Sequence, residues 1–245
     1  MRYRVKTGQV SYGEAIGIVL VENYVPFIPG DVANATTYNY PVRFQRVDGL
    51  TVARIFDHDM DLLSVVQEAV RFLEREGVRA VTGDCGFLAV YQQSIARSAG
   101  IAVFLSSLMQ IPFISQIIGD DGDIGVITAN RDALTKQVFT GAGVPGDMLG
   151  RVRIRGMEDH SHFSDAVVRE LGELDTDLIE QAVVQRAEAL CRDHPRIKAI
   201  LLECSLLPPY GAAVQDAVGL PVFDFVTMID FVYSAVVKRR FTGYM

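Results

Sequence analysis

Short apolar runs alternate along the chain with longer segments of helical spacing. The runs are continuous, which is typical of parallel strands that are covered on both faces. The segments 61–76 and 176–193 place their apolar residues on one stripe, and Gly77 and Pro195 follow them as stop signals. This alternation predicts a doubly wound α/β architecture. The predicted strands are Ala15–Val21, Val78–Thr82, Ile101–Leu105, Ile124–Thr128, Val152–Ile154, Ile197–Leu202 and Pro221–Phe225.

Two stretches interrupt this alternation. Residues 24–48 are rich in Pro, Gly, Asn, Thr and Tyr, and so long a loop inside a compact domain is usually a lid, a binding loop or a disordered segment. We expect a partly ordered binding loop there. The acidic turn Gly119–Gly122 lies near the middle of the chain, where a linker between two halves would be placed.

The two halves of the chain repeat each other. At an offset of 119 residues, segment 78–104 aligns with segment 197–223 without a gap. Apolar patterning common to all strand–helix–strand units would explain the aliphatic matches, but hardly the matched cysteine, tyrosine and glycine. The repeat therefore predicts two similar α/β halves. The identical pairs are Ala80/Ala199, Cys85/Cys204, Leu88/Leu207, Tyr91/Tyr210, Gly100/Gly219, Val103/Val222 and Phe104/Phe223.

Each half carries its cysteine directly after a predicted strand and before a helical segment. This order places Cys85 and Cys204 at the carboxyl ends of parallel sheets, where open α/β folds bind ligands. If the halves pack about a pseudo-twofold axis with these ends facing, the two thiols confront each other across one cleft.

Composition narrows the classes of function. The chain of 245 residues has a formal net charge of −7 and no basic stripe, which argues against a nucleic-acid partner. Three cysteines without a CxxC pair fit neither a disulfide framework nor a four-ligand zinc site, and they favour a reducing cytoplasm. No apolar run approaches the ~20 residues of a membrane span, and the basic start lacks the apolar stretch of a signal peptide. We therefore expect a cytoplasmic protein that acts on a small molecule away from membranes.

The repeated cysteines indicate acid–base chemistry. Backbone N–H groups and the helix dipole lower the pKa of a cysteine near a helix N-terminus. The adjacent Asp84 and Glu203 raise it, unless they face away or act as proton partners. Facing thiols suit the inversion of a stereocentre, in which one removes a proton and the other supplies one, and no organic cofactor is required. Cys191 lies on the apolar stripe of a helix and is interpreted as a core residue.

The segments around these cysteines resemble the aspartate/glutamate racemase superfamily, which includes amino-acid and hydantoin racemases, maleate isomerases and arylmalonate decarboxylases. The resemblance covers nearly the whole chain. It implies catalysis without pyridoxal phosphate or metal, by one cysteine from each domain, at the positions of Cys85 and Cys204. The matching segments are Ile16–Ile18, Gly83–Gly86, Ile124–Thr128 and Leu202–Ser205.

The resemblance also implies the domain organisation. The family fold has two pseudo-symmetric α/β domains with the active site in the cleft between them, and a C-terminal helix that returns to the first domain. In this chain the returning helix would run from about Thr227 to Arg239. The first domain would then comprise residues 1–118 and 225–245, and the second residues 119–224.

The chain departs from the amino-acid racemases at the positions that hold their substrate. Those enzymes follow the two cysteines with Asn-Thr and Thr-His, and carry Asp-Ser after the first strand. Here the backbone N–H groups of Gly86 and Ser205, with the hydroxyls of Ser205 and Thr128, remain to bind a carboxylate or imide oxygen. The apolar neighbours suggest a bulkier or cyclic carbon acid rather than free aspartate or glutamate. The predicted substrate-binding residues are Asn23, Gly86, Phe87, Thr128, Ser205 and Leu206, with Asp84, Glu203, Glu158 and Tyr24 as auxiliary residues.

These features predict an isomerase: a cofactor-independent racemase or epimerase of a small carboxylate or cyclic amide, of amino-acid or hydantoin type. An alternative makes one cysteine a nucleophile and the other an acid, as in a maleate isomerase-like or arylmalonate decarboxylase-like enzyme. The decarboxylase branch keeps only the second-domain cysteine, so the presence of both favours racemisation. A non-catalytic two-domain ligand-binding or redox-sensing protein is a further alternative, and a homo-oligomer remains open.

Overall fold

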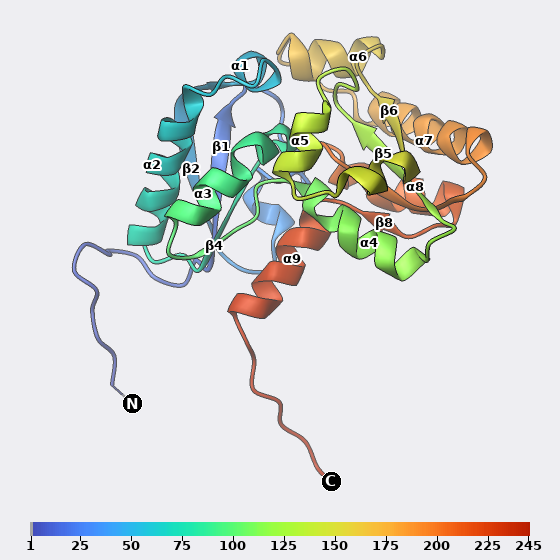
Figure 1. The fold of residues 1–245 in the computed structure, drawn as a ribbon. Helices are drawn as coiled ribbons and strands as arrows, with labels where there is room; N and C mark the ends of the chain where they lie inside the picture. Colours follow the sequence, from blue (N-terminus) through green and yellow to red (C-terminus); the bar gives the residue numbers. More distant parts are fainter. Residues whose placement is uncertain (1) are drawn as a thin grey trace.

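The computed structural model describes residues 2–245, which form two four-stranded sheets flanked by helices (Figure 1). The strand orders, β2-β1-β3-β4 and β6-β5-β7-β8, correspond between the sheets, and every pair is parallel. The predicted doubly wound α/β fold with two similar halves is confirmed. The strands are β1 (Ile16–Glu22), β2 (Val42–Thr51), β3 (Ala80–Gly83), β4 (Ala102–Val103), β5 (Asp123–Thr128), β6 (Val152–Gly156), β7 (Ile197–Leu202) and β8 (Val222–Phe223).

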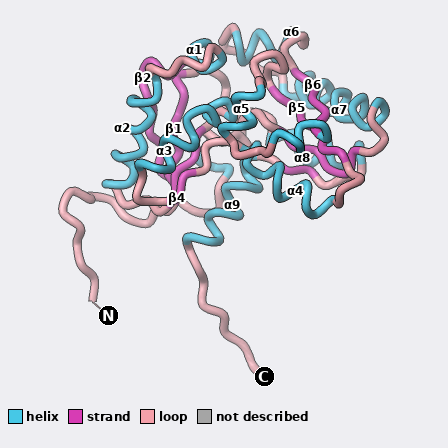
Figure 2. Tube along the Cα trace, viewed as in Figure 1, coloured by secondary structure: helices cyan, strands magenta, loops and turns pink. Residues whose placement is uncertain are grey.

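Helices alternate with these strands along the trace (Figure 2). Within the described chain, no helix combines the length and apolar character needed to cross a membrane. Short 3₁₀ turns follow both cysteine positions, Gly86–Tyr91 in the first half and Pro208–Tyr210 in the second. The α-helices are α1 (Val52–Phe56), α2 (Leu62–Arg75), α3 (Gln92–Ser98), α4 (Ile111–Ile118), α5 (Lys136–Gly141), α6 (Ser161–Phe163), α7 (Thr176–Asp193), α8 (Gly211–Val218) and α9 (Phe225–Val236).

The two long amphipathic helices form where their periodicity predicts them. Helix α2 buries its apolar stripe, including Leu62, Val66 and Leu73, and Gly77 follows it with φ 94°, a conformation that glycine adopts readily. Helix α7 begins after Asp175, whose carboxylate caps the first turn by accepting the N–H groups of Asp177 and Leu178 at 3.1 Å each. Local sequence signals thus determine both helices.

The stretch 24–48 is only in part the loop that the sequence predicts. From Val42 onward the chain forms β2, which runs parallel to β1 at the edge of the first sheet. Its side chains are mostly half-buried, so the segment lacks the continuous apolar run by which the other strands are recognised. The part that remains a loop packs back onto the protein and buries Asp31 and Val32.

One apolar core joins the two halves. It contains β1 residues such as Val19 and Val21 together with Ile124 and Val126 of β5, so the sheets share a continuous interior. Helix α9 packs instead on the other face of the first sheet, where Phe225 and neighbouring side chains contact apolar residues of β1 and β3. The carboxyl ends of the central strands therefore meet between the halves. The exact domain limits stay a prediction.

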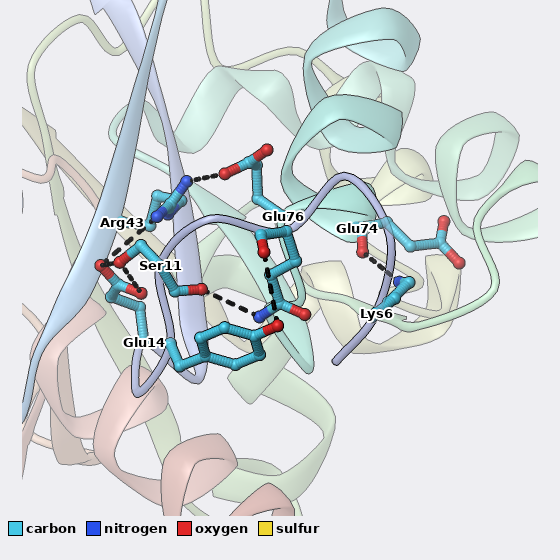
Figure 3. A network of polar contacts seen from close by, with 8 residues as sticks. Lys6, Ser11, Glu14, Arg43, Glu74 and Glu76 are labelled. Carbon is cyan, nitrogen blue, oxygen red and sulfur yellow. Dashed lines mark hydrogen bonds and ion pairs between the residues drawn. The ribbon is translucent and has the colours of Figure 1, made fainter. Parts of the chain in front are cut away.

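The N-terminal segment is held against the first half by a polar network (Figure 3). Arg43 of β2 forms ion pairs with Glu14 at 3.5 Å and with Glu76 after α2. Ser11 donates a hydrogen bond to Glu14, and Lys6 donates one to the backbone carbonyl of Glu74. The Arg43 and Glu76 side chains are only 17% and 13% exposed, so water screens their attraction weakly.

We expect Arg43→Ala to lower the free energy of unfolding by about 1–3 kcal/mol, because it leaves two half-buried carboxylates side by side without a cation. Urea unfolding measures the change. The control is Arg46→Ala on the same strand, whose side chain is 54% exposed and whose ion pairs should contribute about 1 kcal/mol or less. Equal losses in the two variants would contradict the importance of the Arg43 network.

Candidate functional site

Cys85 and Cys204 occupy equivalent places in the two halves. Each follows an acidic residue at the end of a central strand, and the acidic residue's N–H bonds to the neighbouring strand: Asp84 to Val19 at 3.1 Å, and Glu203 to Ile127 at 2.7 Å. Each cysteine carbonyl then accepts the N–H three residues on, at 3.1 Å in both halves. The backbone thus presents the two thiols in the same way, as the sequence repeat predicts.

Both cysteines line one cavity where the halves meet. The empty space inside it, with the open mouth included, is about 460 Å³. The apolar part of the lining includes Phe27, Phe56 and Phe87, and the last two rings meet edge to face with centroids 4.8 Å apart. Among the described residues that line it, acidic side chains are present but Lys, Arg and His are not.

Burial raises the pKa of both thiols. The nearby Glu203 carboxyl raises the pKa of Cys85 and of Cys204 further. Backbone N–H groups nearby act in the opposite direction: those of Phe87 and Leu88 lower the pKa of Cys85, and that of Leu206 lowers the pKa of Cys204. Both thiols are therefore protonated at neutral pH in the free protein, and positive charge entering the cavity would favour thiolate.

The two carboxyl groups beside the thiols also have raised pKa values. Burial raises the pKa of both Asp84 and Glu203 to about 7. Asp84 accepts a hydrogen bond from the N–H of Val21 at 2.9 Å. Glu203 is fully buried and accepts one from the Thr128 hydroxyl at 2.7 Å, while its Oε1 atom has no hydrogen-bond partner.

The structure gathers most of the predicted site residues around this cavity. Thr128 does not line the cavity, but it donates a hydrogen bond to Glu203, which does. Glu158 is exposed and bonds to the N–H of Arg131 instead, and Tyr24 is 59% exposed outside the cavity. The predicted residues that line the cavity are Asn23, Asp84, Cys85, Gly86, Phe87, Glu203, Cys204, Ser205 and Leu206.

Two hydroxyls predicted to bind substrate are already engaged by the protein. Ser205 donates its proton to the backbone carbonyl of Asp84 across the interface between the halves, and Thr128 donates its proton to Glu203. A hydroxyl has one proton, so neither is free to donate to a substrate carboxylate. The role of these side chains in substrate binding stays a prediction, and in the free protein the predicted backbone N–H groups of Gly86 and Ser205 are the donors left for a carboxylate.

Several residues at the site were not predicted from the sequence. Phe27 and Asp31 come from the loop after β1, and Phe56 comes from the short helix α1, which has no recognisable apolar periodicity. Asp31 is buried with one oxygen unpartnered, and burial raises its pKa to about 8. Only the Pro- and Gly-rich composition of the loop signalled that it belongs to the site. No group of three or more potential metal ligands occurs within residues 2–245.

Known proteins are similar to this chain in sequence and in fold. No family model matches the chain. A dimethylsulfoniopropionate lyase from Durusdinium sp. clade D is 32% identical over 223 residues, covering 89% of this chain and 73% of that protein. Dimethylsulfoniopropionate lyase 5 of Emiliania huxleyi is 32% identical over 236 residues, or 90% of this chain and 45% of that protein. The chain thus spans about half the length of the latter relative.

Solved structures share the fold at low sequence identity. Allantoin racemase from Pseudomonas fluorescens superposes with a TM-score of 0.63 at 17% identity, with 91% of each chain covered. Unliganded arylmalonate decarboxylase gives 0.58 at 14% identity, covering 93% of this chain and 94% of the other. The fold is therefore that of the aspartate/glutamate racemase-like superfamily, as the sequence resemblance predicts.

The predicted racemase or epimerase activity, and with it the assignment as an isomerase, is wrong. The curated relatives similar along most of the chain are lyases. Both kinds of reaction can start with the removal of a proton next to a carboxylate. Racemisation and elimination differ at the next step, because elimination requires a leaving group on the neighbouring carbon of the substrate. Fold and cysteine positions do not encode that difference.

Proposed function

The chain belongs to the dimethylsulfoniopropionate lyase family, and we propose that it cleaves the C–S bond of dimethylsulfoniopropionate to give dimethyl sulfide and acrylate. The observation that carries this proposal is its similarity to the curated lyases along most of its length. The cavity supports it, because two thiols suited to proton transfer lie beside carboxyl groups and phenylalanine rings, with no basic side chain in the lining. Such a lining favours a substrate that carries a positive charge.

The proposed reaction is a β-elimination. One cysteine, as thiolate, takes a proton from the carbon next to the substrate carboxylate. The electron pair of the broken C–H bond forms the C=C bond of acrylate, while the C–S bond breaks and its electrons leave with dimethyl sulfide. The proton passes from the thiol to water afterwards. The backbone N–H groups of Gly86 and Ser205 are the proposed partners of the carboxylate, on which negative charge builds up.

The positive charge of the sulfonium group explains how a buried thiol, protonated in the free protein, can become a base. In the free protein, burial and Glu203 raise the pKa of both cysteines. A cation bound in the cavity offsets the negative charge of Glu203, so the pKa of the thiol that acts as base is lower than it would be beside an unpaired carboxylate. Because dimethyl sulfide leaves as a neutral molecule, it needs no proton. Elimination therefore requires one thiol as base, whereas inversion of a stereocentre requires two proton-transferring groups.

The direct test is incubation of the purified chain with dimethylsulfoniopropionate. We expect dimethyl sulfide in the headspace and acrylate in solution in equal amounts, measured by gas chromatography and by proton NMR. Protein in which both Cys85 and Cys204 are replaced by serine serves as the control for non-enzymatic cleavage, which alkaline conditions promote. Failure of the unmodified chain to exceed this control would refute the proposal.

A further inference from the structure

Glu203 has an unusual environment for a carboxyl group. It lies directly after β7, lines the cavity and is fully buried. Its Oε2 atom accepts the Thr128 hydroxyl at 2.7 Å, but its Oε1 atom has no partner. An unpaired carboxyl oxygen away from water is costly, so a native protein rarely keeps one without a use for it.

The other ionisable groups that face Glu203 do not supply the missing partner. They are Asp84 and the thiols of Cys85 and Cys204, all of which are acids, and Asp31, which raises the pKa of Cys204, is an acid as well. The described lining contains no basic side chain. A positive charge that balances Glu203 must therefore arrive with the ligand.

The aromatic part of the cavity lining suits an onium group, which is a methylated sulfur or nitrogen cation. Methyl groups on sulfur or nitrogen cover the positive charge and offer no N–H or O–H donor, so such an ion is held by charge and by aromatic faces rather than by strong hydrogen bonds. Phe27, Phe56 and Phe87 provide aromatic surface in the same cavity as Glu203. Carboxylate and rings together resemble the cages that bind methylated ammonium groups.

We propose that Glu203 is the specificity-determining residue that holds the onium group of the substrate, with Oε1 facing the positive charge. The identity of the onium as a dimethylsulfonium group rests on the proposed function, but the preference for a methylated cation over a neutral group of equal shape does not. Glu203 exchanges its proton for the bound cation, so that the positive charge of the onium group offsets the negative charge of the carboxylate.

The exchange has a measurable consequence. Burial raises the pKa of Glu203 to about 7 in the free protein, and a bound cation lowers it because the charged carboxylate is then stabilised. Binding near neutral pH therefore releases protons to the buffer. Affinity for the cation rises as the pH increases through about 7 and levels off above it, where Glu203 is already ionised.

Two isosteric, unreactive probes test the proposal. One is the trimethylammonium analogue of the substrate, and the other is its neutral tert-butyl analogue, in which carbon replaces nitrogen. By calorimetry at about pH 8 we expect the protein to bind the cation on the order of 10- to 100-fold more tightly. Glu203→Gln keeps the shape and an oxygen for Thr128, and should abolish this preference and reduce the proton release. Glu188→Gln, on the exposed face of α7, should retain both.

Each outcome decides the question. A Glu203→Gln protein that still prefers the cation, or an unmodified protein that binds the probes equally or binds neither, overturns the inference even if dimethyl sulfide is produced. Loss of the preference in that variant sustains it even if the chain fails to cleave dimethylsulfoniopropionate, in which case only the proposed function falls. Should Glu203→Gln not fold, Thr128→Val provides the second test. It removes the hydrogen bond to the carboxylate, so the rise in cation affinity should move to higher pH, and an unmoved profile overturns the inference.

Discussion

Replacing Cys85 and Cys204 by serine one at a time lowers kcat/KM for dimethyl sulfide release unequally. The cysteine that acts as base accounts for a loss on the order of 10²–10⁴-fold, and the other for about tenfold or less. The reason is the neutral leaving group: one proton leaves the substrate and none is returned to it. Serine keeps the shape of the side chain, but its hydroxyl is a far weaker acid and does not form the anion. Initial rates at saturating and limiting substrate measure the effect.

The third cysteine provides a matched control. Cys191 lies on α7, packs against the core of the second half and does not line the cavity. Cys191→Ser should leave the rate unchanged. If Cys85→Ser and Cys204→Ser lose activity equally, both thiols take part in proton transfer and the single-base mechanism is wrong. If neither variant loses activity, the proposed site is wrong.

Gly86→Ala removes most of the activity, with a fall in kcat/KM on the order of 100-fold. A Cβ atom built at Gly86 overlaps Glu203 Oε1, and lies 2.6 Å from Glu203 Cδ and 2.9 Å from its backbone oxygen. The carboxyl would have to swing away from its present position, and the backbone contact would push the two halves apart at the cavity. Overpacking of this kind also costs about 1–3 kcal/mol of stability. Rate measurements and urea unfolding on the same protein separate the two effects.

Gly150→Ala is the matched change in open space. Nothing lies within 4 Å of a Cβ atom at that position, and its backbone does not have a positive φ. Rate and stability should both be nearly unchanged there. A fully active Gly86→Ala protein would show that the close contact between Gly86 and Glu203 is dispensable for the reaction.

The layered fold was predictable from the sequence because its strongest signals are local and repeated. The apolar stripes of α2 and α7 and the continuous run of β5 specify their own elements. The edge strand β2 was not predicted, because its side chains are only half-buried and it follows a loop rich in Pro and Gly. The strand β4 is only two residues long, shorter than the run that suggested it, since pairing with β3 ends there.

The site was predictable only where it depends on strand order. Cys85 and Cys204 follow central strands, so topology alone brings them to one cavity. The unpaired oxygen of Glu203 and the approach of Phe27 depend on packing between distant segments, which no periodicity records. Nor could residue patterns distinguish elimination from inversion, because the decisive leaving group belongs to the substrate.

The most direct test of the elimination mechanism uses dimethylsulfoniopropionate carrying deuterium at both positions of the carbon next to the carboxylate. Elimination predicts a primary isotope effect on kcat/KM and acrylate that retains a single deuterium at that carbon. Absence of this acrylate from reactions with the double cysteine variant would link the reaction to the thiols. Release of dimethyl sulfide without an isotope effect, together with a hydroxylated propionate that keeps both deuterium atoms, would instead indicate displacement by water. That result would contradict proton abstraction as the central step.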